Sequence, residues 1–196
     1  DDLVALTTAQ LAGFGTLQIA ALSSTQVAAL ATDDLAALSA AQVRAIDTRG
    51  MGSFDTADLG ALTSAQLGAL TSAQLAGIGT DTIDGLSTAA LAGLTATQIA
   101  GLTSSQLSAL SSDQLQALSS AQVRALSTAA LGLMATDALN DLTTAQFAAL
   151  TTAQIVAMSS SQFAGLTTDD LAALGSAQLR AIETRDIAAL DSADLG

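Results

Sequence analysis

The sequence predicts an all-α solenoid of very short helices, with one helix in every eight residues. Two unbroken columns of apolar residues and a recurring helix-capping motif indicate this fold. Residues 142–150, which read Leu-Thr-Thr-Ala-Gln-Phe-Ala-Ala-Leu, show one whole unit and the first residue of the next. We call this unit an octad and write it L-[ST]-[ST]-A-Q-φ-x-A, where φ is apolar. A short, fixed sequence period is typical of stacked repeats.

The first apolar column, called here the leucine column, contains every eighth residue from Leu6 to Leu190, and all 24 positions are large and apolar. The second apolar column contains every eighth residue from Leu3 to Leu195, and all 25 positions are apolar. No insertion or deletion interrupts either column, so each octad must meet the same surroundings as its neighbours. We therefore predict a single uninterrupted array of about 24 octads over residues 1–196, without evident capping repeats.

Other regular structures fit this spacing less well. In one continuous helix, eight residues advance by roughly 800°, so the apolar pair would wind around the helix surface. A β-strand needs apolar residues at every second position, whereas the two columns are separated by three and five residues. We expect one short helix and one turn per octad, about two or three octads in each turn of the solenoid, and both columns inside. A β-solenoid is the alternative.

Each octad carries a capping signal. Thr143 begins the pattern T-x-x-Q with Gln146, which is a capping box, and Leu142 with Phe147 forms the hydrophobic-staple pair. Either of the two consecutive hydroxyls could be the cap, and the other would form a ladder along the solenoid, inside or outside. The residues expected to cap helices are Thr63, Thr103, Thr143, Thr151, Gln66, Gln106, Gln146 and Gln154. The residues expected to represent the core columns are Leu6, Leu30, Leu62, Leu102, Leu142, Leu150, Leu11, Leu67, Leu107 and Phe147.

Composition excludes several kinds of partner. The chain has no Pro, Cys, His, Trp, Tyr or Lys, and its formal net charge is -13. Such a chain cannot neutralise a run of phosphates, so we expect no nucleic-acid partner. No apolar run reaches the roughly 18 residues that a membrane-spanning helix needs, so we expect no membrane insertion.

Catalytic chemistry has no candidate residues. Ser and Thr are abundant, but the chain has no His, Lys or Cys to activate them as nucleophiles. Three acidic pairs fall in the turn or the first helical turn of an octad, where a negative charge stabilises the N-terminus of a helix. These pairs are Asp33/Asp34, Asp55/Asp58 and Asp169/Asp170. We therefore expect no enzyme activity, no catalytic residue, no cofactor-binding residue and no metal site.

The sequence also contains a duplication with a period much longer than one octad. Residues 44–49, Arg-Ala-Ile-Asp-Thr-Arg, recur at 180–185 as Arg-Ala-Ile-Glu-Thr-Arg. The acidic and Arg side chains of these segments are expected to form local ion pairs at the surface.

The octads at 62–69 and 150–157 and the variant segment 181–190 resemble repeat regions of very large bacterial surface or secreted proteins, often described as haemagglutinin-like or adhesin-like. The resemblance covers nearly the whole chain. It implies a secreted or cell-surface protein and brings no catalytic residues with it.

The sequence thus favours a structural function: an extracellular rod, stalk or self-assembling fibre on a bacterial surface. Because the apolar columns run to both ends, the expected partners are further copies of the chain, end to end or laterally, or further repeats of a longer chain. The alternative is a binding module that presents a Ser/Thr ladder to ice, a glycan or a host surface.

Overall fold

The computed structural model describes residues 5–190, which form 23 short helices and no strand. The all-α prediction is confirmed for this part of the chain, and the β-solenoid alternative is wrong. Contacts divide the chain into two compact units, residues 1–101 and 102–196. Each unit is a helical repeat solenoid.

The helices contain four to six residues each, so that every octad holds a little more than one helical turn. The first unit contains α1 (Thr8–Ala12), α2 (Thr16–Ala20), α3 (Ser24–Val27), α4 (Thr32–Ala37), α5 (Ala40–Ala45), α6 (Thr48–Met51), α7 (Thr56–Ala61), α8 (Ser64–Ala69), α9 (Ser72–Gly77), α10 (Thr80–Asp84), α11 (Thr88–Gly93) and α12 (Ala96–Ala100). The second unit contains α13 (Ser104–Ala109), α14 (Ser112–Gln116), α15 (Ser120–Ala125), α16 (Thr128–Leu133), α17 (Thr136–Asn140), α18 (Thr144–Ala149), α19 (Thr152–Val156), α20 (Ser160–Ala164), α21 (Thr168–Ala173), α22 (Ser176–Leu179) and α23 (Thr184–Ile187).

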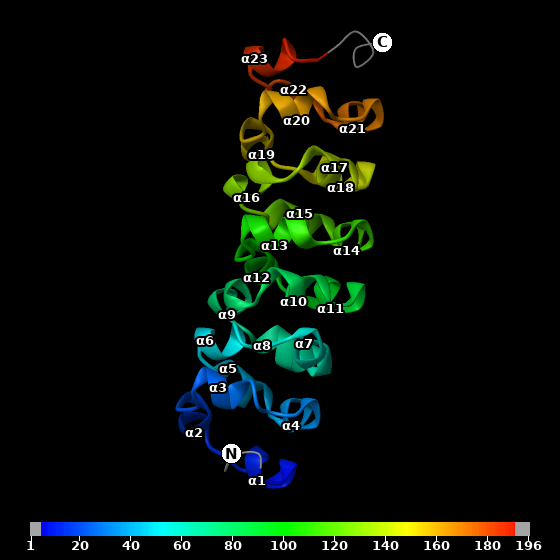
Figure 1. Ribbon diagram of the computed structural model, residues 1–196. Coiled ribbons are helices and arrows are strands. Elements are labelled where there is room, and N and C mark those ends of the chain that lie inside the picture. Colours follow the sequence, from blue (N-terminus) through cyan, green and yellow to red (C-terminus); the bar gives the residue numbers. More distant parts are fainter. Residues whose placement is uncertain (1–4, 191–196) are drawn as a thin grey trace. The chain divides into compact units, whose positions relative to one another are not determined.

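Helices three apart in sequence pack against each other. In the first unit they form the rows α1–α4–α7–α10, α2–α5–α8–α11 and α3–α6–α9–α12. In the second unit α13, α16, α19 and α22 form one such row, and α15, α18 and α21 form another. Figure 1 shows the resulting coils stacked within each unit. Helices this short are not stable in isolation, so their stability must come from stacking.

The length of one coil is set by the hydrogen bonds between successive coils. These bonds join residues separated by as few as 25 positions, from Ser72 Oγ to the Thr97 carbonyl, and by as many as 31, from Gln66 Nε2 to the Leu35 carbonyl. One coil therefore takes between three and four octads. The rows of helices three apart agree with the upper value of the expected two or three octads per turn.

The two columns form the core of each unit. The structure buries the column residues Leu11, Leu30, Leu62, Leu67, Leu102, Leu107, Leu142, Phe147 and Leu150, with at most 7% of any of them exposed. Leu6, in the first described octad, is only half-buried. Full burial of an aliphatic or aromatic side chain contributes roughly 1.5–3 kcal/mol, so an octad that buries both column residues adds two such contributions to its unit. Leu179 and Ile187, in the last described octads, are exceptions with 47% and 44% of their surface exposed.

The residue before the leucine column is Ala or Gly in 21 of 24 octads, and the coil-to-coil packing explains why. In several octads this position approaches the first helical residue of the helix three positions earlier, whereas nothing lies within 4 Å of a Cβ atom added at Gly93. A Cβ atom added to Gly101 would lie 3.0 Å from Ser72 Cα, and one added to Gly165 would lie 2.6 Å from Thr136 Cγ2. Leu133, one of the three exceptions, has a 71% exposed side chain and so points away from this contact.

We expect Gly101→Ala to lower the free energy of unfolding by about 1–3 kcal/mol, since the added methyl group meets Ser72 on α9. The measurement is thermal and urea unfolding followed by far-ultraviolet circular dichroism. Gly68→Ala is the matched control, because nothing lies within 4 Å of a Cβ atom at that helical position. Gly68→Ala should raise stability by roughly 0.5–1 kcal/mol, as expected for Gly-to-Ala in a helix. Equal effects of the two substitutions would contradict the packing explanation.

Candidate functional site

In most of the described helices the N-cap is the first of the two hydroxyl residues; Gly, Ala, Asp or Glu takes this position in the others. Thr143 has extended backbone angles, and its Oγ1 accepts a hydrogen bond from the Gln146 backbone N–H at 3.2 Å. In return, the Thr143 backbone N–H donates to Gln146 Oε1 at 2.8 Å. The structure places the other pairs selected from the sequence in the same reciprocal arrangement: Thr63 with Gln66, Thr103 with Gln106, and Thr151 with Gln154. The second hydroxyl is the first helical residue.

The same glutamine side chain also joins successive coils. Gln146 Nε2 donates to the backbone carbonyls of Leu118 at 2.7 Å and Leu115 at 2.8 Å. These carbonyls lie at the C-terminal end of α14, four helices earlier, where backbone acceptors lack partners within the helix. One amide therefore caps the start of its own helix and the end of a helix in the preceding coil.

We call the side chains that make this connection the glutamine ladder. Its members include Gln42, Gln66, Gln74 and Gln98 in the first unit, and Gln146, Gln154, Gln162 and Gln178 in the second. These side chains are at most 7% exposed. Each amide group uses both its hydrogens and its oxygen, so a buried polar group is satisfied without water.

Sequence reasoning recognised the capping role of these glutamines and missed the ladder. The available signal was the choice of Gln at 14 of 25 such positions and Glu at none. A Glu carboxylate would complete a capping box equally well, but it has no N–H to donate to the preceding coil. The preference for Gln therefore reflects a need for a donor and an acceptor on one side chain.

Aspartate occupies the ladder position in a few octads and cannot make both connections. In α7 the carboxyl group of Asp58 accepts a hydrogen bond from the Asp55 backbone N–H at 3.1 Å, so the capping half is kept. Burial raises the pKa of Asp58; the bond from the Asp55 backbone lowers it, and the nearby Asp55 charge raises it, with a net upward shift. The ionised form of Asp58 is thus less favourable, relative to the neutral form, than it would be in water.

We expect Asp58→Gln to raise the free energy of unfolding at pH 7 by about 1 kcal/mol, because the amide would add a bond to the preceding coil. The folded pKa of Asp58 lies above its ordinary value of 3.8. The ionisation penalty in the wild-type chain is therefore absent below pH 3.8, grows as the pH rises through the folded pKa, and is constant above it. The advantage of the variant should shrink on acidification.

Urea unfolding between pH 3.5 and 7 measures this difference. Asp58→Asn is the control, since it removes the charge with a side chain too short to serve as a ladder rung. If Asp58→Asn matches Asp58→Gln at every pH, the gain comes from charge removal and the ladder contributes nothing at this octad.

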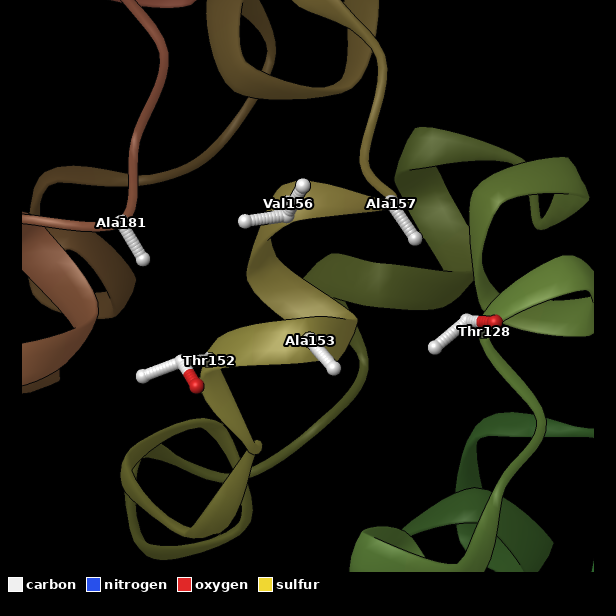
Figure 2. A pocket seen from close by; sticks show the side chains of 6 residues that line it. All are labelled: Thr128, Thr152, Ala153, Val156, Ala157 and Ala181. Atoms are coloured by element: carbon white, nitrogen blue, oxygen red, sulfur yellow. The ribbon is translucent and has the colours of Figure 1, made fainter.

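A shallow surface depression lies in the second unit, between α16, α19 and the end of α22. Figure 2 shows Ala153 and Val156 of α19 between Thr128 on one side and Ala181 on the other, with Thr152 and Ala157 completing the lining. Thr128 and Thr152 are the first residues of helices that stack in one row. The depression therefore combines two hydroxyl groups with small apolar side chains.

Residues 5–190 contain neither a metal-binding cluster nor a membrane-spanning helix. No three His, Cys, Asp or Glu side chains in this range are grouped so that they could share a metal ion. Within the same range no helix has the length and apolar character to cross a membrane.

The repeat detected in the sequence is a known one. A family model described as the ALTTAQ repeat matches residues 1–32, 51–88, 109–144, 134–168 and 163–196, which together are most of the chain. The chain belongs to the ALTTAQ repeat family. No curated protein matches it. The six letters of the family description correspond to residues 5–10 and 149–154, which end on a ladder-position glutamine. The ALTTAQ repeat is thus the segment that contains the small residue, the leucine column, the N-cap and the glutamine of one octad.

Proposed function

We propose that this ALTTAQ repeat chain is a structural protein that forms a rod, stalk or self-assembling fibre outside a bacterial cell, of adhesin or filament type. The observation that carries the proposal is the glutamine ladder together with the buried columns. Each coil satisfies the helix ends and covers the apolar residues of the coil before it. Such an interface can be added repeatedly without changing the unit, which is the property an extended structural element needs.

The partner in this proposal is the repeat itself, in further copies of the chain or further octads of a longer chain. The resemblance to repeat regions of large bacterial surface proteins supports the extracellular assignment. The acidic composition, with a net charge of -13, would keep an Ala- and Leu-rich surface soluble. The proposal assigns the chain no catalytic role and no cofactor.

Sedimentation velocity and negative-stain electron microscopy of the purified chain test the structural proposal. We expect a frictional ratio well above that of a compact protein, or filaments whose length grows with protein concentration. Antibodies against the chain should label intact bacteria that produce it. Compact monomers at every concentration, combined with labelling only after lysis, would contradict the proposal.

The second candidate is a binding module, and the depression with Thr128 and Thr152 favours it. Hydroxyl groups beside small apolar residues are suited to the polar and apolar faces of a sugar ring. Glycan-array binding and ice-recrystallisation inhibition by the wild-type chain and by a Thr128→Ala/Thr152→Ala double variant are the direct tests. Binding by the wild-type chain that is lost in the double variant would support a binding function. No activity of the wild-type chain in either assay would contradict it.

A further inference from the structure

The first coil, which consists of α1, α2 and α3, contains three glutamines that make only half of a ladder rung. Gln10, Gln18 and Gln26 accept hydrogen bonds through Oε1 from the backbone N–H groups of their N-cap residues, at 2.7–2.9 Å. These glutamines are exposed, and their Nε2 atoms donate to no acceptor within the described residues. In the next coil, Gln42 Nε2 donates to the carbonyls of Ala12 and Phe14. The first coil thus presents a set of amide donors that no described coil satisfies.

The last coil, which consists of α21, α22 and α23, presents the matching acceptors. In an internal rung the amide donates to the carbonyls 28 and 31 residues earlier, as Gln146 does to Leu118 and Leu115. The corresponding carbonyls of the last coil include that of Leu174, after α21, and that of Ile182, after α22. Neither accepts a hydrogen bond from a described residue. Because carbonyls at helix ends need partners from outside the helix, this face is complementary to the amides of the first coil.

The apolar columns show the same complementarity. In the first coil the leucine-column residues Leu6, Phe14 and Leu22 are only half-buried. In the later coils this column is buried at every position from 30 to 182. In the last coil the second-column residues Leu179 and Ile187 are 47% and 44% exposed, although this column is buried at every position from 11 to 171. The leucine column therefore needs a preceding coil to cover it, and the second column needs a following one.

The charge distribution favours a second copy of the chain as the occupant of these faces. The whole chain has 18 acidic and five basic residues, so two copies repel each other over most of their surfaces. Residues 5–30, which contain the whole first coil, include no charged residue. A contact at this face avoids the repulsion, and it repeats the coil-to-coil interface that already holds each unit together.

We propose that the first coil of one chain docks on the last coil of a second copy, so that the glutamine ladder continues from copy to copy. Gln10 Nε2 then donates to the Leu174 carbonyl and Gln18 Nε2 to the Ile182 carbonyl, which keeps the octad spacing on both sides. The contact is head-to-tail, so a joined pair still has one free face of each kind and can add further copies. The inference rests on the structural function proposed above and specifies the contact through which copies assemble.

Sedimentation velocity of the full chain over a range of concentrations tests this contact. We expect the mass of the wild-type species to grow with concentration beyond that of a dimer. A Gln10→Glu/Gln18→Glu variant keeps both caps but has no N–H to donate, so its association should require a roughly tenfold or higher concentration. The matched control is Ser108→Glu/Gln116→Glu, which adds the same charge at two exposed positions outside both faces. This control should associate as the wild type does.

A mixture of two variants tests the head-to-tail arrangement. Leu179→Asp places a charge on the last coil and leaves the first coil intact. Alone, this variant and the Gln10→Glu/Gln18→Glu variant should each stay monomeric at concentrations at which the wild type associates. Their equimolar mixture should form dimers and nothing larger, because it contains only one kind of functional joint. Far-ultraviolet circular dichroism checks that each variant is folded.

Association of the Gln10→Glu/Gln18→Glu variant at wild-type concentrations would overturn the inference and leave the proposed function standing, since the copies would then assemble through another surface. A mixture that remains monomeric would also overturn it. If the wild type is monomeric at every concentration, the inference is wrong, and the frictional ratio of that monomer and the labelling of intact cells decide the proposed function separately.

Discussion

Replacing Phe147 by Ala is expected to lower the free energy of unfolding by about 3–5 kcal/mol, the usual cost of deleting a buried aromatic ring. Phe147 belongs to the second apolar column in α18 and has no exposed surface. Its helix α18 packs against α15 and α21, the row neighbours in the two adjacent coils. Because α18 is only six residues long, it cannot persist once this packing is lost. The cavity should therefore unfold the neighbouring coils together.

Urea unfolding followed by circular dichroism measures the loss, and amide hydrogen exchange locates it. Exchange should accelerate most in α15, α18 and α21. The control is Leu133→Ala, which removes a large apolar side chain that is 71% exposed and should change stability by less than about 0.5 kcal/mol. If Phe147→Ala unfolded at the same urea concentration as the wild type, the buried-column description would be wrong.

Replacing Gln154 by Glu is expected to cost roughly 2–4 kcal/mol at pH 7, although the two side chains have the same shape. The carboxylate can still accept the Thr151 backbone N–H, as Gln154 Oε1 does at 2.8 Å. It cannot donate to the carbonyls of Val123 and Leu126, which Gln154 Nε2 reaches at 2.9 Å each. The substitution therefore places an anion against two buried acceptors while leaving the cap intact.

Acidification gives this prediction a distinctive signature. The protonated carboxyl group of the Gln154→Glu variant has a hydroxyl hydrogen to donate, so most of the lost stability should return as the pH falls towards about 4. The same substitution at Gln10 is the control. The Gln10 side chain is exposed, caps Thr7 through its oxygen, and donates to no carbonyl within the described residues. Gln10→Glu should be nearly neutral at every pH, and a Gln154→Glu variant equally neutral would show that the ladder adds no stability.

The predicted helices follow from local chemistry and are found where the octads place them. Thr143 and Gln146 interact within a single helical turn, so their reciprocal cap depends on nothing distant. The choice between two consecutive hydroxyls could not be made from the sequence, because both are good caps. The structure selects the first, since only that choice directs Phe147 into the core.

The glutamine ladder could not be predicted from the sequence, for a different reason. Its bonds join residues 28 to 31 positions apart, and that separation depends on how many octads complete a coil. Octad spacing fixes which residues face inward but not the radius at which the coil closes. Without that radius, the sequence leaves the number of octads in a coil open.

The sequence by itself determined the all-α class, the one-helix-per-octad period, the caps and the two apolar columns, because each depends on contacts within one or two octads. Only the tertiary structure decided the size of a coil, the second role of the glutamine amides and the close contact that requires a small residue before the leucine column. These features arise where one coil meets the next. Their energies belong to pairs of octads, and the repeated sequence of a single octad does not contain the geometry that brings those pairs together.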